Sequence, residues 1–265
     1  NHKGLILCLA IPLLTLHCAV VRAQDPLFRL LDAKRTGIDF VNPVSETENQ
    51  NVMSYEYYYN GGGVAVGDIN NDGYEDVFFT SNMGLNKLYL NLGAKGEKLK
   101  FKDITASAGK GLEGRKGGWK TGVTMADVNG DGLLDIHICY SGKVKDEERK
   151  NQLFINQGNL KFVEQAREYG LDNASYSTQA AFFDYDNDGD LDMMLLNHTT
   201  KKIDNMELAK FRTQTDELAG NKLFENRDNH FTEVTQKAGI HQYPLTFGLG
   251  IAIADVNLDG WQDIY

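Results

Sequence analysis

The sequence predicts an all-β fold, a β-propeller of four-stranded blades. Two observations lead to this prediction: an Asp-rich loop recurs four times, and strand-like segments surround the copies in the same order. The loops begin at Asp68, Asp127, Asp184 and Asp255, so successive copies lie 59, 57 and 71 residues apart. Four short strands in each unit, repeated around an axis, are the arrangement of propeller blades, whereas the coils of a β-solenoid are usually much shorter than these units.

The first unit illustrates how the strands are assigned. Its four candidates are about four to six residues long, contain β-branched or aromatic residues and are separated by turn residues. They are Val64–Gly67, Val77–Thr80, Lys87–Leu90 and Lys100–Thr105. The third strand belongs to a run of the form Asn-x-Leu-aromatic-x-Asn, which recurs at Asn86–Asn91, Asn151–Asn156 and Asn221–Asn226. This recurrence indicates that the later units have the same strand order.

Residues 1–23 have the features of a secretory signal peptide. Lys3 precedes the apolar stretch Leu5–Val21, which is too short for a membrane anchor, and small residues follow it as a cleavage site. Lipid attachment at Cys18 is a weaker alternative, because His17 stands where a lipid-attachment motif has a small residue. We therefore expect a secreted, periplasmic or cell-surface protein with no transmembrane span in this segment.

The remaining chain divides into a lead-in segment, residues 24–54, and a partial propeller, residues 55–265. The blades are expected at about 61–109, 118–171, 176–240 and 246–265. The last blade is incomplete, which gives about three and a half blades, and further blades or domains are expected to follow. Leu27–Ile38 weakly resembles the outer strand segment of a unit and could supply a closing strand. Extra residues around Lys201–Gly220 lengthen the third unit, either as a surface insertion or as a functional lid.

The formal charge of −10 argues against nucleic acid as a partner, because such binding depends on neutralising phosphates with cations. Loss of Lys3 and Arg22 with the signal peptide would make the charge −12. Of the three cysteines only Cys139 would then remain, which excludes an internal disulfide. An exported chain without disulfides needs other stabilising links, and metal ions can provide them.

Each Asp-rich loop has the oxygen pattern of a calcium-binding loop. Calcium prefers six to eight oxygen ligands, and side-chain oxygens at positions 1, 3, 5 and 9 with a backbone carbonyl at position 7 can surround one ion. Gly at position 6 permits the sharp turn that such a loop needs. The predicted ligands are Asp68, Asn70, Asp72, Tyr74 and Asp76; Asp127, Asn129, Asp131, Leu133 and Asp135; Asp184, Asp186, Asp188, Asp190 and Asp192; and Asp255, Asn257, Asp259, Trp261 and Asp263. About four Ca²⁺ sites are therefore expected.

Other interpretations of the loops are weaker. Asp/Asn/Gly turns without metal are one alternative, but four copies in register are far more than average residue usage produces by chance. Magnesium demands a tight octahedron, and zinc prefers His or Cys, which the loops lack. An EF-hand needs Glu at position 12, where the first three loops have Phe79, Ile138 and Leu195. Dockerin-type modules follow the loop with a helix, whereas these loops lead into strand-like segments.

These residues resemble the FG-GAP/VCBS repeats of integrin α-subunit propellers and of many exported bacterial proteins. Phe247 and Gly248 precede the last loop, and the Tyr59–Ala65 segment before Asp68 is similar to the cartilage-acidic-protein-like branch of bacterial surface proteins. The resemblance covers about residues 55–265. It implies a seven-bladed propeller, calcium in the loop between the first two strands of a blade, and a role in binding or adhesion. The chain departs from the family in ending after about three and a half blades.

The leading functional interpretation is a binding or adhesion module for an extracellular protein or glycan. Tyr and Trp are common anchors at binding surfaces, and several of them precede the innermost strands. They are Tyr55, Tyr57, Tyr58, Tyr59, Trp119 and Tyr176. Packing between blades is the competing explanation for these residues.

Two other functions stay open. An extracellular carbohydrate-active enzyme, a lyase or hydrolase, would need a general acid and base in a pocket away from the loops. The sequence assigns no catalytic residue, because its histidines form no paired motif and no nucleophile elbow occurs. We therefore expect no enzymatic activity. The third interpretation is a purely architectural part of a larger surface protein, with no ligand beyond calcium.

Overall fold

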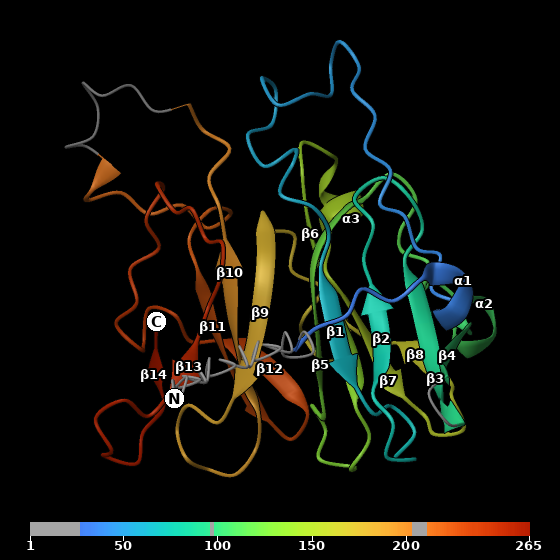
Figure 1. The fold of residues 1–265 in the computed structure, drawn as a ribbon. Helices are drawn as coiled ribbons and strands as arrows, with labels where there is room; N and C mark the ends of the chain where they lie inside the picture. The colour runs from blue at the N-terminus through green and yellow to red at the C-terminus, as the bar shows by residue number, and fades with distance from the viewer. Residues whose placement is uncertain (1–26, 96–97, 203–210) are drawn as a thin grey trace, which may run out of the picture. The chain divides into compact units, whose positions relative to one another are not determined.

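The computed structural model describes residues 27–95, 98–202 and 211–265 (Figure 1). The chain forms two units, residues 1–31 and 32–265. In the first unit the described residues, 27–31, are exposed and form neither helix nor strand. The expected signal peptide lies outside the described residues. All helices and strands given below belong to the second unit.

The described residues of the second unit form three antiparallel sheets of four strands and one of two (Figure 1). The first sheet contains β1 (Val64–Gly67), β2 (Asp76–Phe79), β3 (Lys87–Lys95) and β4 (Lys98–Asp103). The second contains β5 (Trp119–Ala126), β6 (Asp135–Ser141), β7 (Gln152–Asn156) and β8 (Phe162–Glu164). The third contains β9 (Ser177–Phe183), β10 (Asp192–Asn197), β11 (Lys222–Arg227) and β12 (His230–Glu233). The fourth pairs β13 (Ile253–Ala254) with β14 (Asp263–Ile264).

These sheets confirm the predicted all-β fold of propeller blades. Each four-stranded sheet pairs its strands in chain order, and β1 lies next to β5, which lies next to β9 (Figure 1). β1 has the predicted bounds, whereas β3 is longer than predicted because its pairing with β4 continues past an irregularity between Asn91 and Ala94. The boundaries assigned to the lead-in segment and to the individual blades stay predictions.

Three four-residue helices lie wholly within the described ranges: α1 (Ala33–Thr36), α2 (Thr105–Ala108) and α3 (Asp146–Arg149). The suggestion that Leu27–Ile38 supplies an outer strand is wrong. Asp32 caps α1 by accepting the N–H of Lys34, and Gly37 ends it in the left-handed conformation, with φ of 82°. No helix in the described ranges is long and apolar enough to cross a membrane.

The hydrophobic core lies where neighbouring sheets face each other. Phe78 and Leu88 of the first sheet share one buried cluster with Ile136 and Phe154 of the second. A second cluster joins the second sheet to the third, and it includes Cys139. Every residue of β6 and β10 is buried, as expected for strands covered on both faces. Packing between sheets therefore buries these two strands along their whole length, including polar residues such as Asp135 and Ser141.

An asparagine in the third strand links the second sheet to the first and the third sheet to the second. Asn156 donates its side-chain N–H groups to the carbonyl of Ile69, 2.8 Å away in the first sheet's loop, and to that of Leu134, at 3.1 Å. Asn226 repeats this arrangement one sheet later, with the carbonyl of Val128 at 3.4 Å. Each of these carbonyl groups lies in a loop that leads into the second strand of a sheet. The side-chain amide of one asparagine therefore fixes both the strand order in its own sheet and the junction with the preceding sheet.

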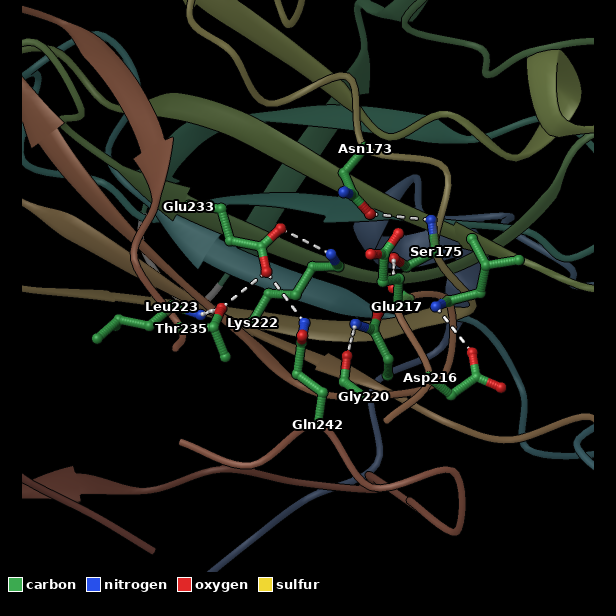
Figure 2. Close-up of polar contacts among 12 residues, drawn as sticks. Asn173, Ser175, Asp216, Glu217, Gly220, Lys222, Leu223, Glu233, Thr235 and Gln242 are labelled. Atoms are coloured by element: carbon green, nitrogen blue, oxygen red, sulfur yellow. Dashed lines mark hydrogen bonds and ion pairs between the residues drawn. The ribbon is translucent and has the colours of Figure 1, made fainter. Parts of the chain in front are cut away.

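The extra residues around Lys201–Gly220, which lengthen the third sequence repeat, are attached at their C-terminal end to the third sheet (Figure 2). Asn197 donates to the carbonyl of Gly220, 2.6 Å away, and Ser175 donates to the carbonyl of Glu217, 3.2 Å away. Nearby, Lys222 and Gln242 both bond to the carboxylate of Glu233, at 2.7 and 3.0 Å (Figure 2). These bonds hold residues 216–220 against the sheet, as a surface insertion requires. Residues 203–210, where a short helix or lid was considered, lie outside the described residues.

The asparagine link predicts an unequal response to two matched substitutions. Asn156→Ala is expected to lower the free energy of unfolding by about 2–3 kcal/mol, because two carbonyl groups would lose their donor. Urea denaturation followed by circular dichroism measures this change. Asn91→Ala is the control, since Asn91 donates to the carbonyl of Glu75 within its own sheet, at 2.9 Å. Equal losses for the two variants would contradict a link between sheets.

Candidate metal-binding loops

The four Asp-rich loops each connect the first two strands of a sheet. We call them loop 1 (68–76), loop 2 (127–135), loop 3 (184–192) and loop 4 (255–263). They share one backbone conformation, in which positions 4 and 6 are left-handed. At position 6 the φ angles are 85°, 84°, 99° and 89° for Gly73, Gly132, Gly189 and Gly260. Only Gly adopts this conformation without steric cost, which explains its place in every loop.

Backbone N–H groups hold the aspartates at positions 1 and 5. In loop 2 the carboxylate of Asp127 accepts the N–H groups of Asp131 and Gly132, at 3.0 and 2.8 Å. The carboxylate of Asp131 accepts the N–H of Leu133 at 2.9 Å. The other three loops repeat all of these bonds. The position-7 residue, whose carbonyl is a predicted ligand, is thereby fixed relative to the carboxylate at position 5.

Three carboxylates converge in loop 3. Oxygens of Asp184, Asp186 and Asp188 lie within 4.8 Å of one another, which is close enough to share one cation. Loops 1, 2 and 4 have Asn at position 3 and therefore fewer charges at the same place. Asp190 adds a further carboxylate to loop 3, although the sequence analysis gave it only a backbone role. Like-charged groups so close together are unfavourable without a counterion.

Some ligand oxygens in the loops have no hydrogen-bond partner. The Oδ1 atoms of Asn70 and Asp186, both at position 3, are shielded from solvent and accept no hydrogen bond, and the same is true of Oδ1 of Asp190. In loops 2 and 4 the position-3 oxygen instead accepts the N–H at position 5. A buried oxygen without a donor is costly, and a hard cation such as calcium satisfies oxygen ligands of this kind. The residues present therefore fit calcium.

The aspartate at position 9 has a different environment from the other predicted ligands. Asp76, Asp135 and Asp192 are fully buried, and each carboxylate accepts two backbone N–H groups. For Asp135 the donors are Val128, at 3.1 Å, and Asn156, at 2.7 Å. Burial raises the pKa of Asp135 to about 7 and that of Asp192 to about 6. The position-9 carboxylate is therefore hydrogen-bonded within the sheet and does not belong to the group of three carboxylates that converges in loop 3.

The partner of position 9 was missed by sequence reasoning. Asn91, Asn156 and Asn226 lie in the third strands, and each donates its backbone N–H to the position-9 carboxylate of its own sheet. The recurrent Asn-x-Leu-aromatic-x-Asn run was visible in the sequence, but nothing in it indicates which loop its last residue contacts. The run proves to be part of the loop's supporting structure.

A second group of polar side chains meets at the opposite ends of β6 and β10 from these loops. The Oγ atom of Ser141 lies 2.7 Å from Nε2 of His198, and the hydroxyl of Tyr55 lies 3.0 Å from the same nitrogen. Nδ1 of His198 lies 2.9 Å from the carbonyl of Thr199, which can only accept, so Nε2 is the acceptor for Ser141. No sequence motif predicted this contact. Ser141 and His198 are both fully buried.

The aromatic residues before the innermost strands serve mainly as packing. Tyr55, Tyr57, Tyr58 and Trp119 form one buried group, which we call the N-terminal aromatic cluster. The ring of Tyr57 stacks on His198 with 3.9 Å between centroids, and Tyr55 packs edge-on against Trp119. Packing between blades is therefore the correct explanation for these four. Tyr59 is 61% exposed, and the partly buried Tyr176 ring packs against Arg149.

Comparison with known proteins agrees with the loop geometry. A protein-family model described as an FG-GAP-like repeat matches residues 68–138 and 140–195. The first match contains loops 1 and 2, and the second contains loop 3. A search of curated proteins found no match.

The environment of position 9 predicts a structural effect that does not depend on metal. At pH 8 in the presence of a chelator, Asp135→Asn is expected to lower the free energy of unfolding by about 2–3 kcal/mol. The reason is that the NH₂ group of the new asparagine, a donor, would face the backbone N–H of Val128 or of Asn156, which is also a donor. Asp131→Asn at exposed position 5 is the control, and a change within about 0.5 kcal/mol is expected. Equal effects in denaturant titrations would mean that position 9 acts only as a metal ligand.

Proposed function

The chain is an FG-GAP repeat protein, and on this basis we propose that it is an extracellular calcium-binding β-propeller module that binds a protein or a glycan. The observation that carries the calcium proposal is the pair of buried, unpartnered oxygens of Asn70 and Asp186. Both occupy position 3, beside the aspartates at positions 1 and 5. An ion there would meet oxygens at positions 1, 3 and 5, with the position-7 carbonyl fixed nearby.

Calcium suits these loops better than other common cations. It accepts six to eight oxygen ligands in a flexible arrangement, whereas magnesium requires a smaller octahedron and zinc prefers nitrogen or sulfur. The loop oxygens are carboxylates, side-chain amides and carbonyls. When bound, calcium would supply the positive charge that offsets the clustered aspartates. Four ions would add eight positive charges to a chain whose formal charge is −10.

The proposed ions would stabilise the whole blade rather than the loop alone. Each loop joins the first two strands of its sheet, and in loops 1, 2 and 3 the position-9 aspartate is also bonded to the third strand. The asparagines at the ends of β7 and β11 then reach the loop of the preceding sheet. A cation that orders one loop therefore restricts three strands and one junction between sheets.

Binding rather than catalysis is the activity that the side chains favour. Exposed aromatic residues are suitable anchors for a protein or glycan. Tyr74 and Trp261 occupy position 7 of loops 1 and 4 and are 47% and 52% exposed, and Tyr59 is also exposed. The closest approach to a catalytic arrangement among the described residues is Ser141 with His198, and its burial argues against an enzymatic role. The proposal therefore includes no catalytic activity. A purely architectural role would need no exposed anchor.

Calcium is expected to raise the melting temperature of the full chain. Any ligand that binds only the folded state stabilises it, by about 2.7 kcal/mol per site at one hundred times the dissociation constant. Differential scanning calorimetry after chelator treatment, with and without calcium, measures the shift, and magnesium at the same concentration is the control. Isothermal titration should find about four sites, and Asp188→Asn should remove or weaken one. Identical melting temperatures in calcium and in chelator would exclude the proposal.

The binding role predicts calcium-dependent retention on an array of glycans and extracellular matrix proteins. Trp261→Ala is expected to weaken that retention at least tenfold if the exposed indole is an anchor. Val163→Ala, at a 48% exposed apolar position outside the loops, is the matched comparison and should leave retention unchanged. Calcium binding with no retention on any array would leave the architectural role as the better description.

A further inference from the structure

Two hydrogen bonds join neighbouring loops. The side chain of Asn71, at position 4 of loop 1, donates to the carbonyl of Gly132, at position 6 of loop 2, over 2.9 Å. The side chain of Asn187, at position 4 of loop 3, donates to the carbonyl of Gly260, at position 6 of loop 4, over 3.2 Å. The same two positions are used both times, although the residues are 61 and 73 apart in the sequence. We call these bonds the inter-loop bridges.

The sequence itself prevents such a bridge between loops 2 and 3. Position 4 of loop 2 is Gly130, which has no side chain to donate. The backbone is nevertheless the same, since φ is 57° at Asn71, 70° at Gly130 and 60° at Asn187. Asn and Gly are the residues that adopt this left-handed conformation most readily. The bridges therefore divide the loops into two pairs, 1 with 2 and 3 with 4.

Each bridge ends on the peptide group that supports a predicted ligand of the next loop. The carbonyl of Gly132 and the N–H of Leu133 belong to one peptide group, and that N–H donates to the carboxylate of Asp131 at position 5. Likewise, the carbonyl of Gly260 and the N–H of Trp261 belong to one peptide group, and that N–H donates to the carboxylate of Asp259 over 2.9 Å. Accepting a hydrogen bond at the carbonyl polarises the peptide and strengthens its N–H as a donor. The asparagine of one loop thus orients the position-5 carboxylate of the next.

The bridging asparagine is in turn held by its own loop. Position 4 lies between the predicted ligands at positions 3 and 5, so a cation that fixes those ligands also fixes the asparagine backbone. We propose that the four loops bind calcium as two coupled pairs, in which occupation of one loop raises the affinity of its bridged partner. This inference rests on the proposed calcium function. Coupling between two sites is reciprocal, so either loop of a pair can be the first to fill.

Loop 4 contains its own reporter of metal binding. Trp261 at position 7 would sensitise the luminescence of Tb³⁺, a common substitute for calcium, when the ion is bound in that loop. Excitation of tryptophan alone avoids Tyr74, and loss of the signal in Trp261→Phe assigns it to loop 4 rather than to Trp119, the other tryptophan in the chain. The half-saturating Tb³⁺ concentration then measures the affinity of one loop in the intact protein.

The test removes one bridge without disturbing the backbone. Asn187→Gly gives loop 3 the residue that loop 2 has naturally, and it is expected to raise the half-saturating concentration of loop 4 roughly two- to tenfold, the size expected for one hydrogen bond. Asn71→Gly is the matched control, because it removes the other bridge and should leave loop 4 unchanged. Disabling loop 3 with Asp188→Asn should weaken loop 4 in the chain with Asn187 and have no such effect in Asn187→Gly.

The outcomes separate this inference from the function on which it rests. Absence of sensitised luminescence in the folded wild-type chain would exclude a metal ion in loop 4 and overturn the coupling. Absence of any calcium binding in isothermal titration would also remove the calcium proposal. Luminescence with equal loop 4 affinity in wild type, Asn187→Gly and Asn71→Gly would leave calcium binding intact and overturn the coupling. Equal weakening of loop 4 by both asparagine substitutions would also overturn it, because the effect would not follow the pairs.

Discussion

The position-9 aspartate, which is buried in loops 1, 2 and 3, is the group on which the rest of the structure depends. In loop 2, Asp135 accepts one N–H from the start of the loop and another from Asn156 at the end of β7. Asn156 then donates its side-chain amide to the loop of the preceding sheet. One carboxylate therefore connects loop closure, strand order and the packing of neighbouring sheets. In loop 4 the corresponding Asp263 accepts the N–H of Val256.

Local features could be predicted from the sequence because they depend on residues close together in the chain. The spacing of Asp68, Asp72 and Asp76 with Gly73 is sufficient to define a loop, and the apolar segments on either side are sufficient to define strands. Repetition then extended the same assignment to three further loops. α1 was missed because a four-residue helix is decided by its caps, Asp32 and Gly37, rather than by periodicity.

Contacts between neighbouring sheets could not be predicted from the sequence, because they depend on how one sheet lies against the next. The contacts of Asn156 with Ile69 and of Asn71 with Gly132 join residues that no periodicity relates. The meeting of Ser141 with His198 is of the same kind. The repeat period indicates that equivalent positions exist in each unit, but the relative rotation and height of adjacent sheets decide which of them touch. The positions of the loops were therefore predictable, and the residues that support the loops were not.

The N-terminal aromatic cluster imposes an order on how the chain acquires its structure. Tyr55 contacts His198, which lies 143 residues later in the sequence. During synthesis from the N-terminus, the tyrosines before β1 therefore meet all their partners only after the first two sheets and the first two strands of the third have been made. Contacts of such long separation form slowly, and apolar surface left exposed meanwhile promotes aggregation. The segment before β1 is thus made early but enclosed late.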